Sequence, residues 1–262
     1  MPVTDFSLDQ EELIFYREHG YLIRSRVFAT LEIARLLESV EAAVQSAYDQ
    51  TRRGRSYMLD GKRFVDVGKM TVQFEHVPGS NTIRVIEPVQ HLHPDLEDLI
   101  TDKRIVAPIR SILGGEISIW TNKLNLKRGD EGSGFGWHQD SPYWVHDSDH
   151  VDRLTNVYLA FDDATEANGC LRVIDRSHHG GCLPGTTDGT QLGGFFTAPQ
   201  CFEEQDAVSL TLTAGSIVFF DAHTIHGSSP NQTGEARRAI VMTYQPSGFP
   251  MLKTGEIKNI NI

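Results

Sequence analysis

The sequence predicts a mainly β protein with flanking helices: a helical part over about residues 1–115, packed on a β-core over about 116–246. Two observations predict this division. The first third carries apolar residues at helical spacing, whereas the chain from Glu116 onward consists of short alternating segments separated by Gly, Pro and Asp. Such segments are typical of an antiparallel sandwich or barrel. No repeat or linker interrupts the chain, so we expect one domain, 1–262.

Helices are expected at three places in the N-terminal part. Ser7 and Gln10 form a capping-box pattern before "EELIFYREHG", and Gly20 should end that first helix. An apolar stripe at helical spacing predicts an amphipathic helix from Thr30 to about Tyr48. The segment "HPDLEDLITDKRIVAPIRSILGG" predicts a further helical region that ends at its glycine pair.

Strands are expected wherever apolar and polar residues alternate. A short strand, "YLIRSRVF", follows the first helix. The β-core should contain "ISIWTNKLNLK", "RLTNVYLAFDD", "AVSLTLTAGSIVFFDAH" and "ARRAIVMTYQP", the third of which divides into two strands at Ala214-Gly215.

The composition limits the partners of the protein. Its net charge of −11, from 24 basic and 35 acidic residues, argues against nucleic acid and anionic membranes as partners. The N-terminus "MPVTDFSLDQEEL" is polar rather than a secretory leader, and no apolar run approaches the roughly 20 residues of a membrane helix. The three cysteines lack CxxC spacing and are expected to be free thiols. We therefore expect a cytoplasmic location.

A candidate metal site lies in "FGWHQDSPYW". In a strand, residues i and i+2 point to the same side, so His138 and Asp140 would present an imidazole and a carboxylate together. They would form two-thirds of a 2-His-1-carboxylate triad, which holds Fe(II) and leaves open positions for oxygen and co-substrates. Alone, the pair is more typical of a surface or hydrogen-bonded contact than of a metal site.

A third ligand must come from a distant strand. The segment "FFDAHTIHGSSPNQTGEARRAI" offers His223 and His226, and Arg237 follows His226 by eleven residues. On an apolar strand, Arg237 would face inward and would need an anion, because an unpaired buried charge costs several kcal/mol. A dicarboxylate meets that need through bidentate hydrogen bonds. The residues therefore favour Fe(II) together with a 2-oxo diacid.

These motifs together resemble the phytanoyl-CoA dioxygenase family of Fe(II)/2-oxoglutarate oxygenases. "FYREHGYLIRSRVF" and "ANGCLRVIDRSHHGG" are also similar to stretches of that family, although Ile174-Asp175-Arg176 stands where the family often has Pro-Gly. The resemblance spans nearly the whole chain. It implies a double-stranded β-helix, the jelly-roll or cupin-like core, with Fe(II), 2-oxoglutarate and O2 as cofactor and co-substrates.

The resemblance also implies roles for individual residues. His138, Asp140 and His226 match the iron ligands and are the expected catalytic residues. The eleven-residue interval from His226 to Arg237 favours His226 over His223 as the third iron ligand. We expect His223 to be a hydrogen-bonded residue next to the site.

Four further residues match positions that contact 2-oxoglutarate in the family. Arg237 matches the arginine that pairs with its distal carboxylate, and Ser228 matches the small hydroxyl residue beside that arginine. Lys127 and Tyr158 match contacts that vary within the family.

The substrate should lie near the aromatic residues of the motif. Tyr143 and Trp144 follow the ligand pair, where the chain should reach the mouth of the barrel. Gln73 and Phe74, in "KMTVQFEHV", are further candidates, with core packing as the alternative.

The expected reaction is hydroxylation of an unactivated C–H bond in a small molecule of secondary metabolism. Desaturation, epimerisation and cyclisation share the same chemistry, whereas halogenating relatives replace the carboxylate that Asp140 retains. Two other classes are a non-catalytic barrel that binds a metal or diacid and a cupin-type isomerase or hydrolase. The intact triad with Arg237 argues against a non-catalytic barrel. A cupin-type isomerase or hydrolase would not need an arginine after the last ligand, so Arg237 argues against that class as well. No motif indicates the oligomeric state.

Overall fold

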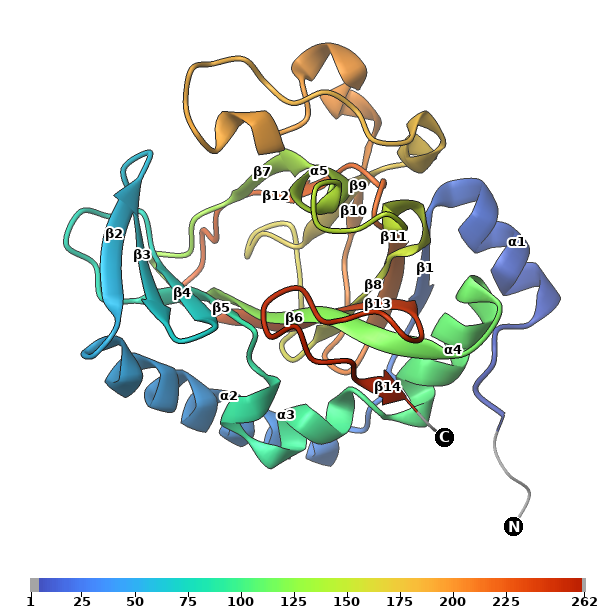
Figure 1. The fold of residues 1–262 in the computed structure, drawn as a ribbon, viewed down its shortest axis with the longest axis horizontal. Coiled ribbons are helices and arrows are strands. Elements are labelled where there is room, and N and C mark those ends of the chain that lie inside the picture. Colours follow the sequence, from blue (N-terminus) through green and yellow to red (C-terminus); the bar gives the residue numbers. More distant parts are fainter. Residues whose placement is uncertain (1–4, 261–262) are drawn as a thin grey trace.

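The computed structural model describes residues 5–260, which form two antiparallel sheets with flanking helices (Figure 1). The larger sheet has ten strands in the order β1-β11-β8-β13-β6-β5-β4-β3-β2, with β14 paired to β6. The smaller sheet has the order β10-β9-β12-β7. Figure 1 shows the smaller sheet above the centre of the larger one, which is the jelly-roll arrangement.

The strands predicted from alternation in the β-core are β6, β8, β10, β11 and β13, and the structure adds β7, β9 and β12. The larger sheet contains β1 (Tyr21–Arg24), β2 (Arg55–Leu59), β3 (Lys62–Val67), β4 (Met70–Phe74), β5 (Ile83–Glu87), β6 (Ile117–Lys127), β8 (Thr155–Ala160), β11 (Ile217–Asp221), β13 (Arg237–Pro246) and β14 (Asn259–Ile260). The smaller sheet contains β7 (Phe135–His138), β9 (Leu171–Ile174), β10 (Ala207–Leu210) and β12 (His226–Ser228).

The helices are α1 (Gln10–His19), α2 (Thr30–Thr51), α3 (Pro94–Leu99), α4 (Lys103–Leu113) and the single turn α5 (Ser141–Trp144). Figure 1 shows α2, α3 and α4 beneath the larger sheet. Their apolar residues share one core with outward-facing residues of the central strands, among them Leu124, Leu159 and Ile240. The helices therefore cover one face of the larger sheet, and its other face is left for the cavity. No helix within residues 5–260 is long and apolar enough to cross a membrane.

The predicted helices are confirmed, with two corrections at their ends. The capping box of α1 is Asp9 with Glu12 rather than Ser7 with Gln10: the Glu12 amide donates to Asp9 at 2.8 Å and the Asp9 amide donates to Glu12 at 3.1 Å. The third helical region divides because Asp102 caps a new helix, α4, through the Arg104 amide at 2.9 Å.

The expectation of a helical part over about 1–115 is wrong for residues 55–87, which form β2 to β5. Asp60 and Gly61 connect β2 to β3 with φ angles of 49° and 74°. This left-handed pair makes a tight hairpin, and an Asp-Gly pair between two strand-like runs is its sequence signal. The hairpins extend the larger sheet beyond β6 and form one wall of the cavity described below.

Candidate active site

Three potential metal ligands come together between the two sheets. His138 ends β7, His226 begins β12, and the two are paired across the ladder with ring centroids 4.1 Å apart. Asp140 lies just after β7, in a helical backbone conformation at the start of α5, rather than on the strand itself. One potential ligand atom of each residue lies within 4.8 Å of the others. The structure therefore brings the three side chains together, as the sequence predicts.

Each imidazole is oriented so that one nitrogen is left for a metal. Nδ1 of His138 lies 2.7 Å from the Gly136 carbonyl oxygen, and Nδ1 of His226 lies 2.9 Å from that of Thr224. A carbonyl oxygen only accepts, so Nδ1 must carry the proton in both rings. The Nε2 atoms are then unprotonated, which is the state a metal ion binds.

The carboxylate of Asp140 is held on both oxygens. Asn156 donates to Oδ2 at 2.9 Å, and Lys123 donates to Oδ1 at 3.4 Å. Thr243 in turn donates to Asn156 Oδ1 at 2.6 Å, which fixes the orientation of the amide. This chain of contacts, on β8 and β13, aims Asp140 toward the two imidazoles.

The charges of the three ligands suit a divalent cation. Burial and the neighbouring His226 lower the pKa of His138 to about 3, and burial also lowers the pKa of His226. Burial alone would raise the pKa of Asp140, but Lys123 and the two imidazoles outweigh it and hold that pKa below its usual value. Two neutral nitrogen ligands and one carboxylate on a single side are the donor set of a facial triad, so the residues fit Fe(II).

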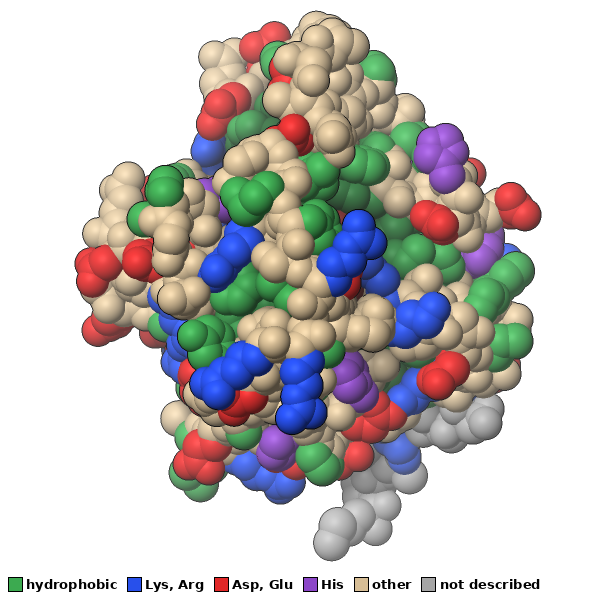
Figure 2. Space-filling view, turned by 60° about the vertical axis from the view of Figure 1, so that its left-hand side comes forward, with side chains coloured by type: hydrophobic (Ala, Val, Ile, Leu, Met, Phe, Trp, Pro, Cys, Tyr) green, Lys and Arg blue, Asp and Glu red, His purple; other side chains and the backbone are tan. Residues whose placement is uncertain are grey.

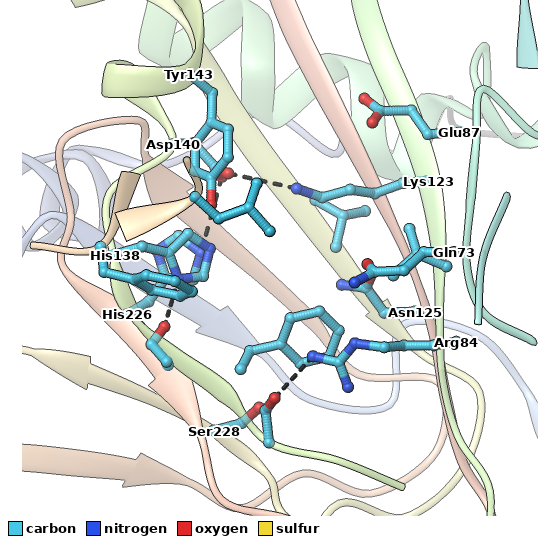
Figure 3. A pocket seen from close by; sticks show the side chains of 18 of the residues that line it. Gln73, Arg84, Glu87, Lys123, Asn125, His138, Asp140, Tyr143, His226 and Ser228 are labelled. Carbon is cyan, nitrogen blue, oxygen red and sulfur yellow. Dashed lines mark hydrogen bonds and ion pairs between the residues drawn. The ribbon is translucent and has the colours of Figure 1, made fainter. Parts of the chain in front are cut away.

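A cavity of about 620 Å³ opens beside the three ligands (Figure 3). Its walls come from the hairpin strands β3 to β5, from the central strands β6, β8 and β13, and from β7 and β12 of the smaller sheet. Figure 2 shows the hollowed face of the molecule, with Lys and Arg side chains gathered around it. The volume is that of an ordinary small-molecule site.

The inner end of the cavity holds Arg237, which is 2% exposed. Its Nη1 donates to the Tyr158 hydroxyl at 2.5 Å, while its buried Nε has no partner among the described residues. No carboxylate within residues 5–260 lies within 4.0 Å of this guanidinium. Tyr158, Ser228 and Arg237, three of the four residues for which the resemblance implies contact with 2-oxoglutarate, line the cavity.

Two further buried basic side chains lie beside Arg237. Arg84 is 3% exposed and donates to the carbonyl oxygens of Ser133 and Gly134 at 2.8 and 2.7 Å. Its Nη1 lies 3.8 Å from Oε2 of Glu75. Lys127 is fully buried. Burial, then the charges of Arg237 and Arg84, lower the pKa of Lys127 to about 6.

The position of Lys127 differs from the predicted contact with the co-substrate. Its Nζ donates to Ser228 Oγ at 2.8 Å and to the carbonyls of Gly169 and Ser229, and Lys127 is not among the residues that line the cavity. Asn125, two residues earlier on β6, lines the cavity instead, and its buried Oδ1 has no partner in the described part of the chain. Lys127 thus supports Ser228 from behind.

The inner end of the cavity therefore carries more positive than negative charge. The cations are Arg84 and Arg237, which Lys127 joins below about pH 6, and Glu75 is the carboxylate buried with them. Uncompensated buried charge is costly, so this pocket is built to receive an anion.

Three of the four residues predicted to contact the substrate line the cavity. Tyr143 stacks on Phe195 with ring centroids 4.3 Å apart, and Trp144 is 4% exposed against Trp120. Gln73 points into the cavity from β4 (Figure 3).

Phe74 lies elsewhere, in the hydrophobic core. Neighbouring residues of a strand point to opposite faces, so Gln73 and Phe74 could not both reach the substrate. The guanidinium of Arg63 stacks on the ring of Phe74 at 3.7 Å.

Sequence reasoning missed Arg84, Glu87, Lys123 and Asn125, which also line the cavity. Arg84 could have been predicted from the sequence. Like Arg237, it is an arginine within an apolar strand. The rival ligand His223 is buried and hydrogen-bonded, with Ser141 and Asp152 each at 2.8 Å from its ring nitrogens.

Comparisons with known proteins agree with this geometry. A sequence model of the phytanoyl-CoA dioxygenase family matches residues 16–239. An ectoine dioxygenase of Bordetella parapertussis is 29% identical over 251 residues, which cover 91% of this chain and 75% of that protein. An L-proline trans-4-hydroxylase of Streptomyces griseoviridis is 27% identical over 183 residues, 63% of this chain and 68% of that protein.

Solved structures share the fold. EctD from S. alaskensis, solved with 2-oxoglutarate and 5-hydroxyectoine, has a TM-score of 0.69 at 23% identity, covering 93% of this chain and 78% of that one. EvdO2 from Micromonospora carbonacea var. aurantiaca, solved with 2-oxoglutarate, has a TM-score of 0.65 at 22% identity, covering 92% of each chain.

Proposed function

Because this chain belongs to the phytanoyl-CoA dioxygenase family, we propose that its cavity carries out an Fe(II)- and 2-oxoglutarate-dependent hydroxylation of a small molecule. The chain is a dioxygenase of this class, with iron, 2-oxoglutarate and O2 as its cofactor and co-substrates. The observation that carries the proposal is the meeting of two unlike groups in one cavity: a His-Asp-His face with one negative charge, and the buried guanidinium groups of Arg84 and Arg237.

The iron ligands in this proposal are His138, Asp140 and His226. When bound, the iron supplies the redox chemistry by which 2-oxoglutarate and O2 become succinate and CO2 while one oxygen atom goes to the substrate. Asn156 and Lys123 hold the carboxylate in place for that metal.

The binding residues for 2-oxoglutarate in this proposal are Arg237, Tyr158 and Ser228, with Asn125 beside them. Arg237 would form paired hydrogen bonds with the distal carboxylate, since a guanidinium matches the geometry of a carboxylate. Tyr158 orients Arg237 through its hydroxyl, and Lys127 orients Ser228. Arg84 adds positive potential at the same end.

The substrate in this proposal is a small molecule that enters on the side of Tyr143, Trp144 and Gln73. The relatives named above act on ectoine and L-proline, which are small polar molecules. A cavity of about 620 Å³ leaves room for a molecule of that size beside the diacid. The three cysteines are unpaired, in keeping with a proposed cytoplasmic location.

Succinate formation tests this proposal. The protein is incubated in air with Fe(II), ascorbate and 2-oxoglutarate, and succinate is measured with and without candidate substrates. We expect slow succinate formation without substrate and faster formation with it, and isotopically labelled O2 should place one oxygen atom in a hydroxylated product. A product that forms without gaining oxygen would instead indicate desaturation, epimerisation or cyclisation.

A further inference from the structure

Two opposite charges lie side by side on the substrate half of the cavity. Val85 of β5 pairs with Asn125 of β6, and Ile86 pairs with Leu124. The same antiparallel register, carried one residue further, brings Glu87 opposite Lys123, and both side chains line the cavity (Figure 3). Residues opposite each other on neighbouring strands have Cβ atoms roughly 5 Å apart.

Among the side chains that the structure describes, the carboxylate of Glu87 accepts a hydrogen bond on only one of its two oxygens. Thr121 donates to its Oε1 at 2.7 Å, and no Lys, Arg or His within residues 5–260 forms an ion pair with it inside 4.0 Å. A half-buried carboxylate with an unused oxygen attracts a hydrogen-bond donor, most strongly a cationic one.

Lys123 presents the complementary charge. Its ammonium lies 3.4 Å from Asp140 Oδ1, close to the three metal ligands. In the iron-loaded protein the charge of Asp140 is shared with a divalent cation, so less of it remains to balance Lys123. The ammonium is then able to pair with an anionic group of a bound molecule.

The remaining lining of this half suits a compact organic frame. Tyr143, Trp144 and Leu252 supply aromatic and aliphatic surface. Two other lysines of the lining are engaged elsewhere: Lys62 lies over the Phe196 ring at 5.2 Å, and Lys253 donates to Thr71 at 3.3 Å. Asp147 also lines the cavity, but at an exposed position, so Glu87 and Lys123 remain as the less exposed pair of opposite charges.

We propose that Glu87 and Lys123 select a small zwitterion of the amino-acid type, with its cationic nitrogen on Glu87 and its carboxylate on Lys123. The inference rests on the proposed function, because it names the substrate class of the same site. The close spacing of the two side chains favours molecules whose charges are separated by one or two carbon atoms. The nearness of Lys123 to Asp140 places the oxidised carbon close to the substrate carboxylate.

A panel of matched probes tests this assignment. The standard amino acids and β-alanine are each supplied as the free zwitterion, as the N-acetyl derivative, which lacks the cation, and as the amide, which lacks the carboxylate. Two readouts are taken: stimulation of succinate formation, and the change in visible absorption of the anaerobic Fe(II)–2-oxoglutarate protein on addition of the probe. At least one zwitterion should produce both signals, and both of its blocked forms should lose them.

Charge-removing variants tie the selectivity to the two residues. Glu87→Gln should raise KM for the effective zwitterion about ten- to hundredfold, as expected for loss of a charged hydrogen bond. The same variant should lower the ratio of kcat/KM for the zwitterion to kcat/KM for its N-acetyl form. Lys123→Met should lower the ratio of kcat/KM for the zwitterion to kcat/KM for its amide. These ratios would not change if the two residues had only structural roles. Glu38→Gln and Lys103→Met, at exposed positions on α2 and α4, are the matched controls and should leave both ratios unchanged.

The outcomes separate this inference from the function on which it rests. If the iron and 2-oxoglutarate absorption forms, succinate appears without substrate, and no zwitterion of the panel gives a signal, the zwitterion assignment is overturned and the dioxygenase stands. The same holds if only singly charged or neutral probes give signals. If neither the absorption nor succinate appears, the proposed function itself is overturned.

Discussion

The two ends of the cavity differ in how completely the protein satisfies its own polar groups. At the metal end, both imidazoles and the carboxylate of Asp140 are held by hydrogen bonds, and only the atoms that face one another are free. At the inner end, two buried guanidinium groups, Arg84 and Arg237, and the buried amine of Lys127 share one buried carboxylate, Glu75. The first end is oriented before any ligand arrives, and the second end is completed by its ligand. Changes at the metal end should therefore affect catalysis as a whole, whereas changes at the inner end should affect affinity for the diacid.

The largest effect is expected at the metal end. His226→Ala removes one of the three converging ligand atoms, so iron binding and succinate formation should fall to the background level. His223→Ala is the matched control, because His223 lies three residues earlier and contacts Ser141 and Asp152 instead. It should lower stability but keep substantial turnover. Wild-type turnover by His226→Ala would show that the ligand set is misassigned.

At the inner end, Arg237→Ala should weaken 2-oxoglutarate binding. Loss of a paired, charge-assisted contact should raise the dissociation constant by about a hundredfold, and iron binding should remain close to that of the wild type. Arg238→Ala is a control on the same strand, because Arg238 faces the other way and pairs with Asp162 and Glu41. Equal dissociation constants for Arg237→Ala and Arg238→Ala, measured by calorimetry under anaerobic conditions, would contradict the assignment.

The orientation of Asp140 offers a smaller test of the metal end. Asn156→Ala removes the 2.9 Å hydrogen bond to Oδ2 without removing a metal ligand. Loss of such a supporting contact typically reduces metal affinity by about ten- to a hundredfold. Competition with a chelator measures that affinity. An unchanged value would mean that Lys123 alone fixes the carboxylate.

The smallest expected effect is a pH dependence at the inner end. Lys127 has a pKa lowered to about 6, and a bound dianion should raise it by stabilising the ammonium. Binding above pH 6 should therefore take up a proton, so the dissociation constant of 2-oxoglutarate should rise with pH by at most about tenfold per unit. Below pH 6 the dissociation constant of 2-oxoglutarate should not change with pH.

Calorimetry in buffers of different ionisation enthalpy measures the proton uptake. Lys127→Met should abolish the slope. The same slope in wild type and variant would assign the titration to another group.

The residues of the site also differ in how far the sequence predicts them. His226 and Arg237 are connected through one short segment, and the alternation of β13 fixes which face Arg237 takes, so spacing alone brings them into one site. Arg84 and Glu87 reach the cavity from β5, whose pairing with β6 depends on hairpins that are not evident from periodicity. The Asp60-Gly61 turn was the available signal.

Lys127 illustrates a second limit of sequence reasoning. It lies on the inward-facing register of β6 with Lys123 and Asn125, so alternation predicts the correct face. Whether its amine reaches the cavity depends on Gly169, in the turn before β9, and on Ser228 and Ser229, at the end of β12, which accept its hydrogen bonds. Such contacts follow from tertiary packing and leave no pattern along the chain.

The most direct test of the account is an anaerobic titration of Fe(II) into the protein with 2-oxoglutarate, followed by visible absorption. Chelation of iron by the 2-oxo acid in the site should give a charge-transfer band in the wild type and in Arg238→Ala. The band should be absent in His226→Ala and should require far more 2-oxoglutarate in Arg237→Ala. A band of full strength in His226→Ala, at wild-type concentrations of iron and diacid, would contradict the claim that His138, Asp140 and His226 form the metal centre.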